Sequence, residues 1–229
     1  MNELWEGFLK AIHLVATLDP EVAGIALRSL QISAISTLLS SLVCIPLGGL
    51  IHFHRFSGRR LLLNVIQTFY SFPTVCIGLI VFLLVSRSGP LGGLGLLFTP
   101  TAMIMAQVLL IAPILLGLTV SALSGVDKAI KDTALSLGAT QFQVIWTIIK
   151  EARFAVGAAI IMGFSRAISE VGAAIMVGGN IKGFTRVLTT AIALETQKGD
   201  LAFALALGIV LVVLALVISI TMNAIQGKY

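Results

Sequence analysis

Two ionisable residues, Arg166 and Glu170, lie inside an apolar run and are four positions apart. An ionisable side chain within a membrane costs at least about 2.5 kcal/mol unless it is paired or hydrated. Residues at this spacing share one face of a helix and can form an ion pair. The pair could stabilise a helix bundle internally. It could also line a polar pathway, in which Arg166 attracts a dianion and Glu170 restrains it.

Small and polar residues surround these two charges in the stretch "SRAISEVGAAIMVGGNIKGFTR". Glycines allow membrane helices to pack closely, and they also allow the backbone to bend. We expect close packing at Gly172, whereas close packing and a bend or gate are equal alternatives at Gly178 and Gly179. The hydrogen-bond donors of this stretch could contact an oxyanion, or they could be satisfied within the chain, as is usual in helices and loops. These donors are Ser165, Ser169, Asn180 and Thr185.

The sequence lacks the residue patterns that ATP binding, hydrolytic catalysis or metal binding would require. The sequence has no Gly-x-x-x-x-Gly-Lys-Ser/Thr loop for ATP phosphates and no Ser-His-Asp or His-Glu-x-x-His arrangement for catalysis. Cys44 and Cys76 fall inside apolar runs and are expected to be buried hydrophobic residues. His52 and His54 are read as loop residues that do not share a metal. We therefore expect no catalytic residue, no metal site and no cofactor in this chain.

The composition indicates a membrane protein. Of the 229 residues, 58% are hydrophobic and 11% are charged, and the mean hydropathy is +1.06. A soluble domain carries roughly 25% charged residues, so the charges here are too few to cover a water-facing surface. The net charge of +5 comes from basic residues scattered at the ends of apolar runs. Membrane proteins place basic residues there, so this charge does not indicate nucleic-acid binding.

Five apolar runs are long enough to cross a bilayer, which requires about 20 residues. Lipid cannot satisfy backbone polar groups and no alternating strand pattern is present, so these runs should be α-helices. Prolines inside the runs, such as Pro73, are expected only to kink them. Residues 3–18 are predicted to form an N-terminal interfacial amphipathic helix. The prediction is one all-α transmembrane domain, residues 1–229, with spans at 22–51, 61–85, 98–123, 154–177 and 201–225.

The basic residues indicate an orientation for these spans. The cluster "HFHRFSGRR" supplies Arg55, Arg59 and Arg60, and short loops near span ends count most in the positive-inside rule. The loop 125–153 and Lys228 lie on the same side as this cluster. We expect that side to face the cytoplasm, with the N-terminus outside and the C-terminus inside.

The loop 125–153 has helical character of its own. Apolar residues recur at spacings of three and four on both sides of Gly138, which suggests a break between two short helices. From the pattern alone, the loop could lie on lipid headgroups as an amphipathic helix. Its small residues would equally allow a short helix to seat closely in a groove of another protein.

This loop, "DKAIKDTALSLGATQFQVIWTIIKEAR", resembles the cytoplasmic signature of ABC importer permeases. Family members carry Glu-Ala-Ala, then a glycine, then an isoleucine and a Leu-Pro pair. Asp132-Thr133-Ala134 stands at the triplet, Gly138 at the glycine and Ile148 at the isoleucine, whereas the Leu-Pro pair is missing. The resemblance implies the type I importer permease fold with a coupling helix that docks on an ATPase. The implied coupling residues are Asp132, Thr133, Ala134, Leu135, Leu137, Gly138 and Ala139.

The stretches "SRAISEVGAAIMVGGNI" and "TRVLTTAI" resemble permeases for tetrahedral oxyanions, most closely the tungstate type. The resemblance implies the permease subunit of an ATP-driven importer that works by alternating access as a homodimer. Molybdate or sulfate remain alternatives to tungstate. The implied pathway or gate residues are Arg166, Ser169, Glu170, Gly172, Gly178, Gly179 and Asn180.

The same resemblance implies the partners and the location of the chain. The expected partners are a second copy, two copies of a cytoplasmic ABC ATPase that binds ATP and Mg, and an extracytoplasmic oxyanion-binding protein, with membrane lipid around them. The expected location is the cell (inner) membrane of a bacterium or archaeon. A secondary transporter driven by an ion gradient is the alternative from another class, but the internal repeats typical of such proteins are not visible here.

Overall fold

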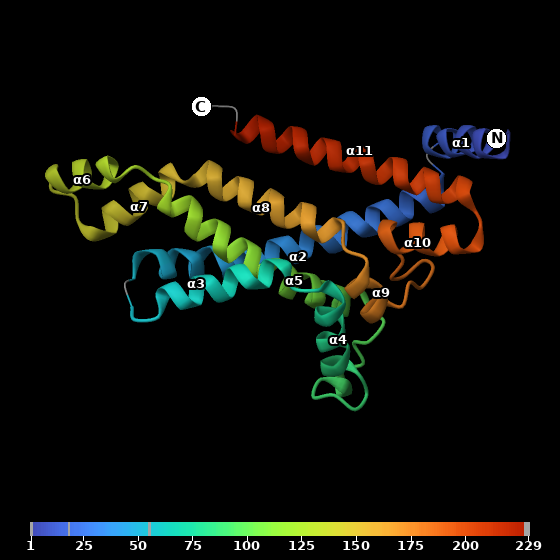
Figure 1. Cartoon of the computed structure of the whole chain (residues 1–229), viewed down its shortest axis with the longest axis horizontal. Helices are drawn as coiled ribbons and strands as arrows, with labels where there is room; N and C mark the ends of the chain where they lie inside the picture. Colours follow the sequence, from blue (N-terminus) through green and yellow to red (C-terminus); the bar gives the residue numbers. More distant parts are fainter. Residues whose placement is uncertain (1, 18, 55, 227–229) are drawn as a thin grey trace.

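The computed structural model of the chain is built of helices (Figure 1). The structure describes residues 2–17, 19–54 and 56–226, and for residues 2–6, 222, 223, 225 and 226 it describes the backbone alone. Within these residues there is no β-strand, as predicted for an all-α protein. The elements are α1 (Asn2–Ala16), α2 (Pro20–Phe53), α3 (Arg59–Thr68), the 3-10 helix η1 (Phe69–Ser71), α4 (Thr74–Val85), the 3-10 helix η2 (Gly92–Leu94), α5 (Pro100–Ser124), α6 (Lys128–Ser136), α7 (Gln141–Glu151), α8 (Arg153–Ile168), α9 (Gly172–Gly178), α10 (Leu188–Lys198) and α11 (Leu201–Gln226).

Three of the described helices, α2, α5 and α11, are long and apolar enough to cross a membrane. The number rises to as many as five if each of two bent helix pairs, α3 with α4 and α8 with α9, is one span. The count of five spans therefore stays a prediction. Figure 1 shows α6 and α7 at one end of the bundle, and α9, α10 and the start of α2 at the other.

Helix α2 is longer than the predicted span 22–51. Asp19 caps its start, because Oδ1 accepts hydrogen bonds from the backbone N–H groups of Glu21 (2.9 Å) and Val22 (3.1 Å). The helix has 34 residues and continues to Phe53. His52 is therefore part of its last turn, and the interpretation of this residue as a loop residue was wrong. Its Nδ1 lies 3.1 Å from Oγ of Ser124 at the end of α5.

The predicted span 61–85 is not one helix. It is broken between η1 and α4, and the two halves meet at an angle of 97°. Pro73 precedes α4 and has no backbone N–H, and Phe72 before it is extended with ψ 132°. Proline disfavours the helical conformation in the residue before it, so the helix ends here. The expectation of only a kink at Pro73 was wrong.

The predicted span 154–177 is also broken, by 60° between α8 and α9. The break lies at residues 169–171, before Gly172, and not at Gly178 and Gly179, where a bend was one of two alternatives. Gly179 has a φ of +68° and ends α9. A further helix, α10, follows in a stretch that was interpreted as a connection, and it packs against α11 and α2.

The loop 125–153 holds two short helices, α6 and α7, on either side of Gly138, as its pattern predicts. Gly138 has a φ of +81°, which a residue with a Cβ adopts only under strain. Asp127 caps α6, and Thr140 and Gln143 form a capping box at the start of α7. Buried Val144 and Ile148 pack α7 onto Leu123 at the end of α5, so the loop is held to the bundle.

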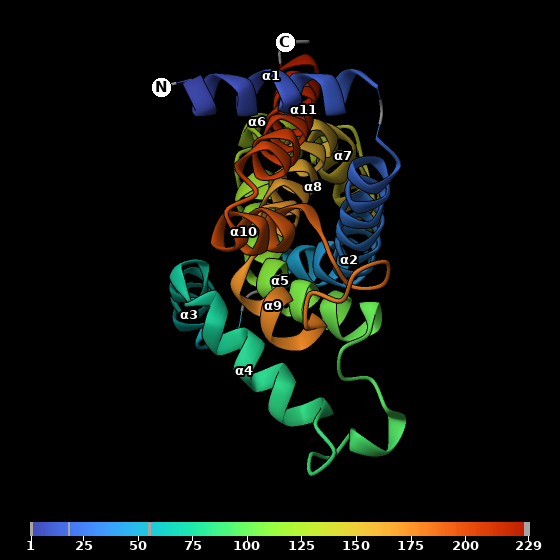
Figure 2. The ribbon, with the colours of Figure 1, turned by 90° about the vertical axis from the view of Figure 1, so that its right-hand side faces the viewer.

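The centre of the bundle is the contact between α2 and α5. One face of α2 consists of small polar residues that are buried, and small residues allow two membrane helices to approach closely. Those buried residues are Ser29, Ser33, Ser36, Thr37, Ser40 and Ser41. In Figure 2 helix α1 lies across the direction of α11, and the two helices are in contact.

Candidate functional site

The two charges that the sequence singles out are paired at the break between α8 and α9. Nη1 of Arg166 lies 3.0 Å from Oε2 of Glu170. The arginine side chain is 32% exposed in this chain, whereas the carboxylate is 2% exposed. The two residues do not share a helix as expected, because α8 ends at Ile168 and Glu170 lies beyond it. The ion pair therefore spans a helix end.

Glu170 also holds the start of α9. Its second oxygen, Oε1, accepts a hydrogen bond of 2.9 Å from the backbone N–H of Ala173. The first N–H groups of a helix lack partners inside it and favour a negative charge. One carboxylate thus binds a side chain of α8 and the backbone of α9.

Two polar side chains from other elements bind backbone carbonyl groups at this break. Nε2 of Gln107 on α5 donates to the carbonyl of Ala167 over 3.1 Å. Oγ1 of Thr189 on α10 donates to the carbonyl of Glu170 over 2.6 Å. Both side chains are buried. Sequence reasoning missed them, although an amide within the apolar run 98–123 was a signal for Gln107.

The predicted hydrogen-bond donors all have partners within the chain. Ser165 donates to the carbonyl of Ile161, and Ser169 to that of Arg166. The amide of Asn180 binds Thr190 through both its oxygen and its nitrogen. Thr185 donates to the carbonyl of Gly178. Ser165 and Ser169 thus bind carbonyls of α8, whereas Asn180 and Thr185 bind groups of the turn after α9 and of α10.

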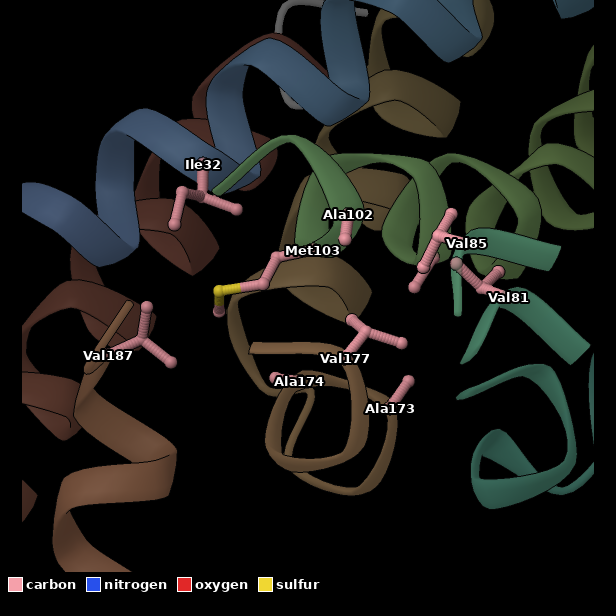
Figure 3. Packing of buried hydrophobic residues seen from close by; sticks show 10 residues of the cluster. Ile32, Val81, Val85, Ala102, Met103, Ala173, Ala174, Val177 and Val187 are labelled. Atoms are coloured by element: carbon pink, nitrogen blue, oxygen red, sulfur yellow. The ribbon is translucent and has the colours of Figure 1, made fainter. Parts of the chain in front are cut away.

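The predicted glycines lie at close contacts. A Cβ on Gly172 would lie 3.0 Å from Oγ1 of Thr74 on α4. A Cβ on Gly178 would lie 2.7 Å from Sδ of Met103, which Figure 3 shows beside α9. Gly172 and Gly178 thus allow neighbouring helices to approach α9.

The predicted coupling residues lie at the opposite end of the bundle and do not meet the Arg166–Glu170 pair (Figure 1). Ala134 and Ala139 are half-buried against α7 and the end of α5. Asp132, Thr133 and Gly138 are exposed. Leu135 is 40% exposed and Leu137 is 82% exposed. The loop therefore presents apolar side chains outward beside small residues.

Charged residues of alternating sign join three elements at the end of the bundle opposite to α6. Glu195 on α10 binds Lys198 (2.9 Å) and Arg186 (3.5 Å). Glu21 at the start of α2 binds Lys182 (2.8 Å) and lies 4.0 Å from Arg186. Arg186 and Glu195 are buried. The cluster ties α10 and the segment before it to α2.

The described residues contain no group of three or more His, Cys, Asp or Glu side chains that could hold a metal ion. A cavity of about 720 Å³ opens between the end of α5, the start of α6 and α8. Its lining is mostly apolar and small, with Ser121, Asp127 and Glu151 as polar members. Arg166 is not part of this lining.

Comparison with known proteins identifies relatives that match the chain over all or nearly all of its length. The chain is 42% identical over 228 residues to the tungstate uptake system permease protein TupB of Peptoclostridium acidaminophilum, covering 100% of both chains. It is 36% identical over 215 residues to the protein of the same name from Campylobacter jejuni, covering 94% of this chain and 90% of the relative.

Among solved structures, a chain of a bacterial ABC transporter involved in the import of the acidic polysaccharide alginate has the same fold. Its TM-score is 0.74 at 19% identity, and the match covers 100% of this chain and 90% of that chain. The profile of the family described as "Binding-protein-dependent transport system inner membrane component" matches residues 44–229. The chain therefore belongs to the family of inner membrane components of binding-protein-dependent transport systems.

Proposed function

We propose that this chain is the membrane subunit of an ATP-driven importer for tungstate. The observation that carries the proposal is the 42% identity to a tungstate uptake permease over the whole chain. The exposed leucines of the loop 125–153 support it, because an ATP-driven transporter whose membrane subunit has no ATP site needs a contact surface for an ATPase.

The proposed assembly has a second copy of the chain, two ABC ATPase subunits and an extracytoplasmic oxyanion-binding protein. Each ATPase contacts the coupling residues of one copy, Asp132 to Ala139. The binding protein delivers the anion at the end of the bundle that carries α10. In this arrangement the N-terminus is outside, the C-terminus is in the cytoplasm, and α1 lies at the membrane interface.

The exposure of Arg166 supports a polar pathway in the assembly. A guanidinium that faced lipid within the apolar run 154–177 would cost free energy. The exposed 32% of the Arg166 side chain should therefore face water or protein in the assembly. Glu170 neutralises part of its charge, which would let a dianion be attracted and still leave. The pathway would run past Arg166 and Ser169 and would be closed or opened by α9.

The proposed cycle links the coupling residues of the loop 125–153 to the pathway residues at the break between α8 and α9. ATP and Mg are bound by the ATPase, whose closure would move both coupling loops and open the pathway outward, and hydrolysis would reset it inward. A ligand can shift such an equilibrium only through different affinities for the two states. The anion-loaded binding protein and ATP together would supply that difference.

Reconstitution tests both the energy source and the anion. Proteoliposomes with this chain, its ATPase and its binding protein should take up labelled tungstate only with ATP. Labelled molybdate and sulfate, measured in parallel, decide among the oxyanions. Uptake that follows an ion gradient without ATP would instead show a secondary transporter.

A further inference from the structure

The two broken helix pairs, α3 with α4 and α8 with α9, are in contact with each other. Their C-terminal halves, α4 and α9, pack against each other. A Cβ on Gly78 of α4 would lie 2.8 Å from Cα of Ala173 and 3.1 Å from Sδ of Met176. The backbones are thus in direct contact, so α4 and α9 cannot slide apart without opening a gap.

Figure 3 shows the hydrophobic cluster that this contact belongs to. Val81 and Val85 come from α4, Ala173 and Val177 from α9, and Met103 from the start of α5. Each of these five side chains is at most 1% exposed. The carbonyl of Val177 also accepts a hydrogen bond of 2.9 Å from the N–H of Phe98.

The attachment of α9 to α8 is of a different kind. The Glu170 carboxylate binds Arg166 and the N–H of Ala173. Gln107 on α5 and Thr189 on α10 donate to the carbonyls of Ala167 and Glu170. A hydrogen bond can re-form after a small rotation, whereas a close-packed cluster resists it. The contact between α4 and α9 is therefore close-packed, whereas the joint at residues 169–171 is held by hydrogen bonds.

We propose that Gln107 and Thr189 are positioning residues that set the angle of this joint, and that α9 moves together with α4 as one unit. Thr189 orients the main chain of Glu170, whose carboxylate binds Arg166. Movement of the joint is thereby linked to the charge that faces the proposed pathway. This link to transport rests on the proposed function, but the mechanical unit does not.

Hydrogen exchange of the full-length chain in nanodiscs tests the unit. Thr189→Val removes the hydroxyl that binds Glu170, and loss of a hydrogen bond of this kind should raise local opening about five- to tenfold. Exchange should rise together in residues 172–178 and 74–85 and stay unchanged in residues 128–151. Thr189→Ser retains the hydroxyl and should behave like the wild type. Gln107→Leu should act like Thr189→Val.

The matched control is Thr196→Val on the same helix. Oγ1 of Thr196 donates to the carbonyl of Ile192 within α10 and binds nothing at the joint. The inference is overturned if exchange rises in 172–178 without 74–85, if neither segment changes, or if 128–151 rises as well.

A transport assay separates this inference from the proposed function. Thr189→Val should lower the maximal rate of tungstate uptake while the affinity for the loaded binding protein stays unchanged. If the wild type imports no tungstate, the proposed function fails, yet the exchange result stands by itself. If the wild type imports tungstate and Thr189→Val does so at the same maximal rate, the positioning role fails.

Discussion

Arg166 and Glu170 are joined by a 3.0 Å ion pair although the end of α8 lies between them. The usual reason for a pair at this spacing is a continuous helix face. Here the chain leaves the helix after Ile168, and Glu170 reaches both Arg166 and the backbone of Ala173. The ion pair therefore connects α8 to a carboxylate that also binds the start of α9, and the two charges have different roles.

Replacing the two charges should separate these roles. Arg166→Ala leaves the buried Glu170 carboxylate without its cation, and a loss of about 1–3 kcal/mol in the free energy of unfolding is expected. Tungstate uptake should fall at least tenfold. Glu170→Gln should retain an acceptor for the Ala173 N–H but should alter the dependence of uptake on anion concentration. Thermal unfolding and uptake in proteoliposomes measure both effects.

Arg87→Ala is the matched control, because Arg87 is an exposed arginine in the connection between α4 and α5. It should change neither quantity. Normal uptake by Arg166→Ala would remove the pathway role and leave only the structural one.

Tyr70 should limit what can replace Gly117. A Cβ on Gly117 of α5 would overlap the hydroxyl of Tyr70 in η1, so Gly117→Ala requires the tyrosine ring to move. Such overpacking costs about 1–3 kcal/mol. Tyr70→Phe removes the nearest atom, so the double variant should be more stable than Gly117→Ala alone. Additive losses in thermal unfolding would contradict this contact.

Gly49→Ala is the control for this pair, since a Cβ at Gly49 meets nothing within 4 Å. Alanine is favoured over glycine within a helix by about 1 kcal/mol. Gly49→Ala should therefore be neutral or slightly stabilising.

A substitution at an exposed residue of the loop 125–153 should weaken ATPase binding and leave folding stability unchanged. Leu137 is 82% exposed, so Leu137→Ser removes little packing and should leave thermal unfolding unchanged. Co-purification of the ATPase should fall several-fold, because an exposed apolar anchor at an interface is lost. Leu94→Ser is the control, since Leu94 is 66% exposed and lies in η2, outside the loop 125–153. Equal ATPase recovery with both variants would rule out docking through Leu137.

Substitutions in the charge cluster around Arg186 should lower the free energy of unfolding by unequal amounts. The side chains of Arg186 and Glu195 are 10% and 9% exposed, and Glu195→Gln leaves the arginine with a weakened partner. Breaking a buried pair in this way should cost about 3–5 kcal/mol. The side chain of Lys198 is 51% exposed, and Lys198→Met should cost less than about 1 kcal/mol. Thermal unfolding of both variants checks the ranking, and equal losses would contradict it.

Local patterns in the sequence were enough to predict several features. Few charges and long apolar runs indicate a membrane protein, and without an alternating strand pattern only helices satisfy the backbone in lipid. The break at Gly138 was predictable, since a glycine between two helical patterns can adopt the positive φ that ends a helix. The residues around Asp132 and Gly138 were sufficient to suggest the family to which the chain belongs.

Other features depend on residues that are far apart in the chain. The break at residues 169–171 has no glycine or proline inside it, and Gln107 on α5 and Thr189 on α10 donate hydrogen bonds to the carbonyls of Ala167 and Glu170 beside it. No local pattern contains those partners. The seating of α4 on α9 likewise depends on Gly78 meeting Ala173 across two helices. Local spacing therefore determined which residues could form helices, and tertiary packing decided where those helices break and which charges face one another.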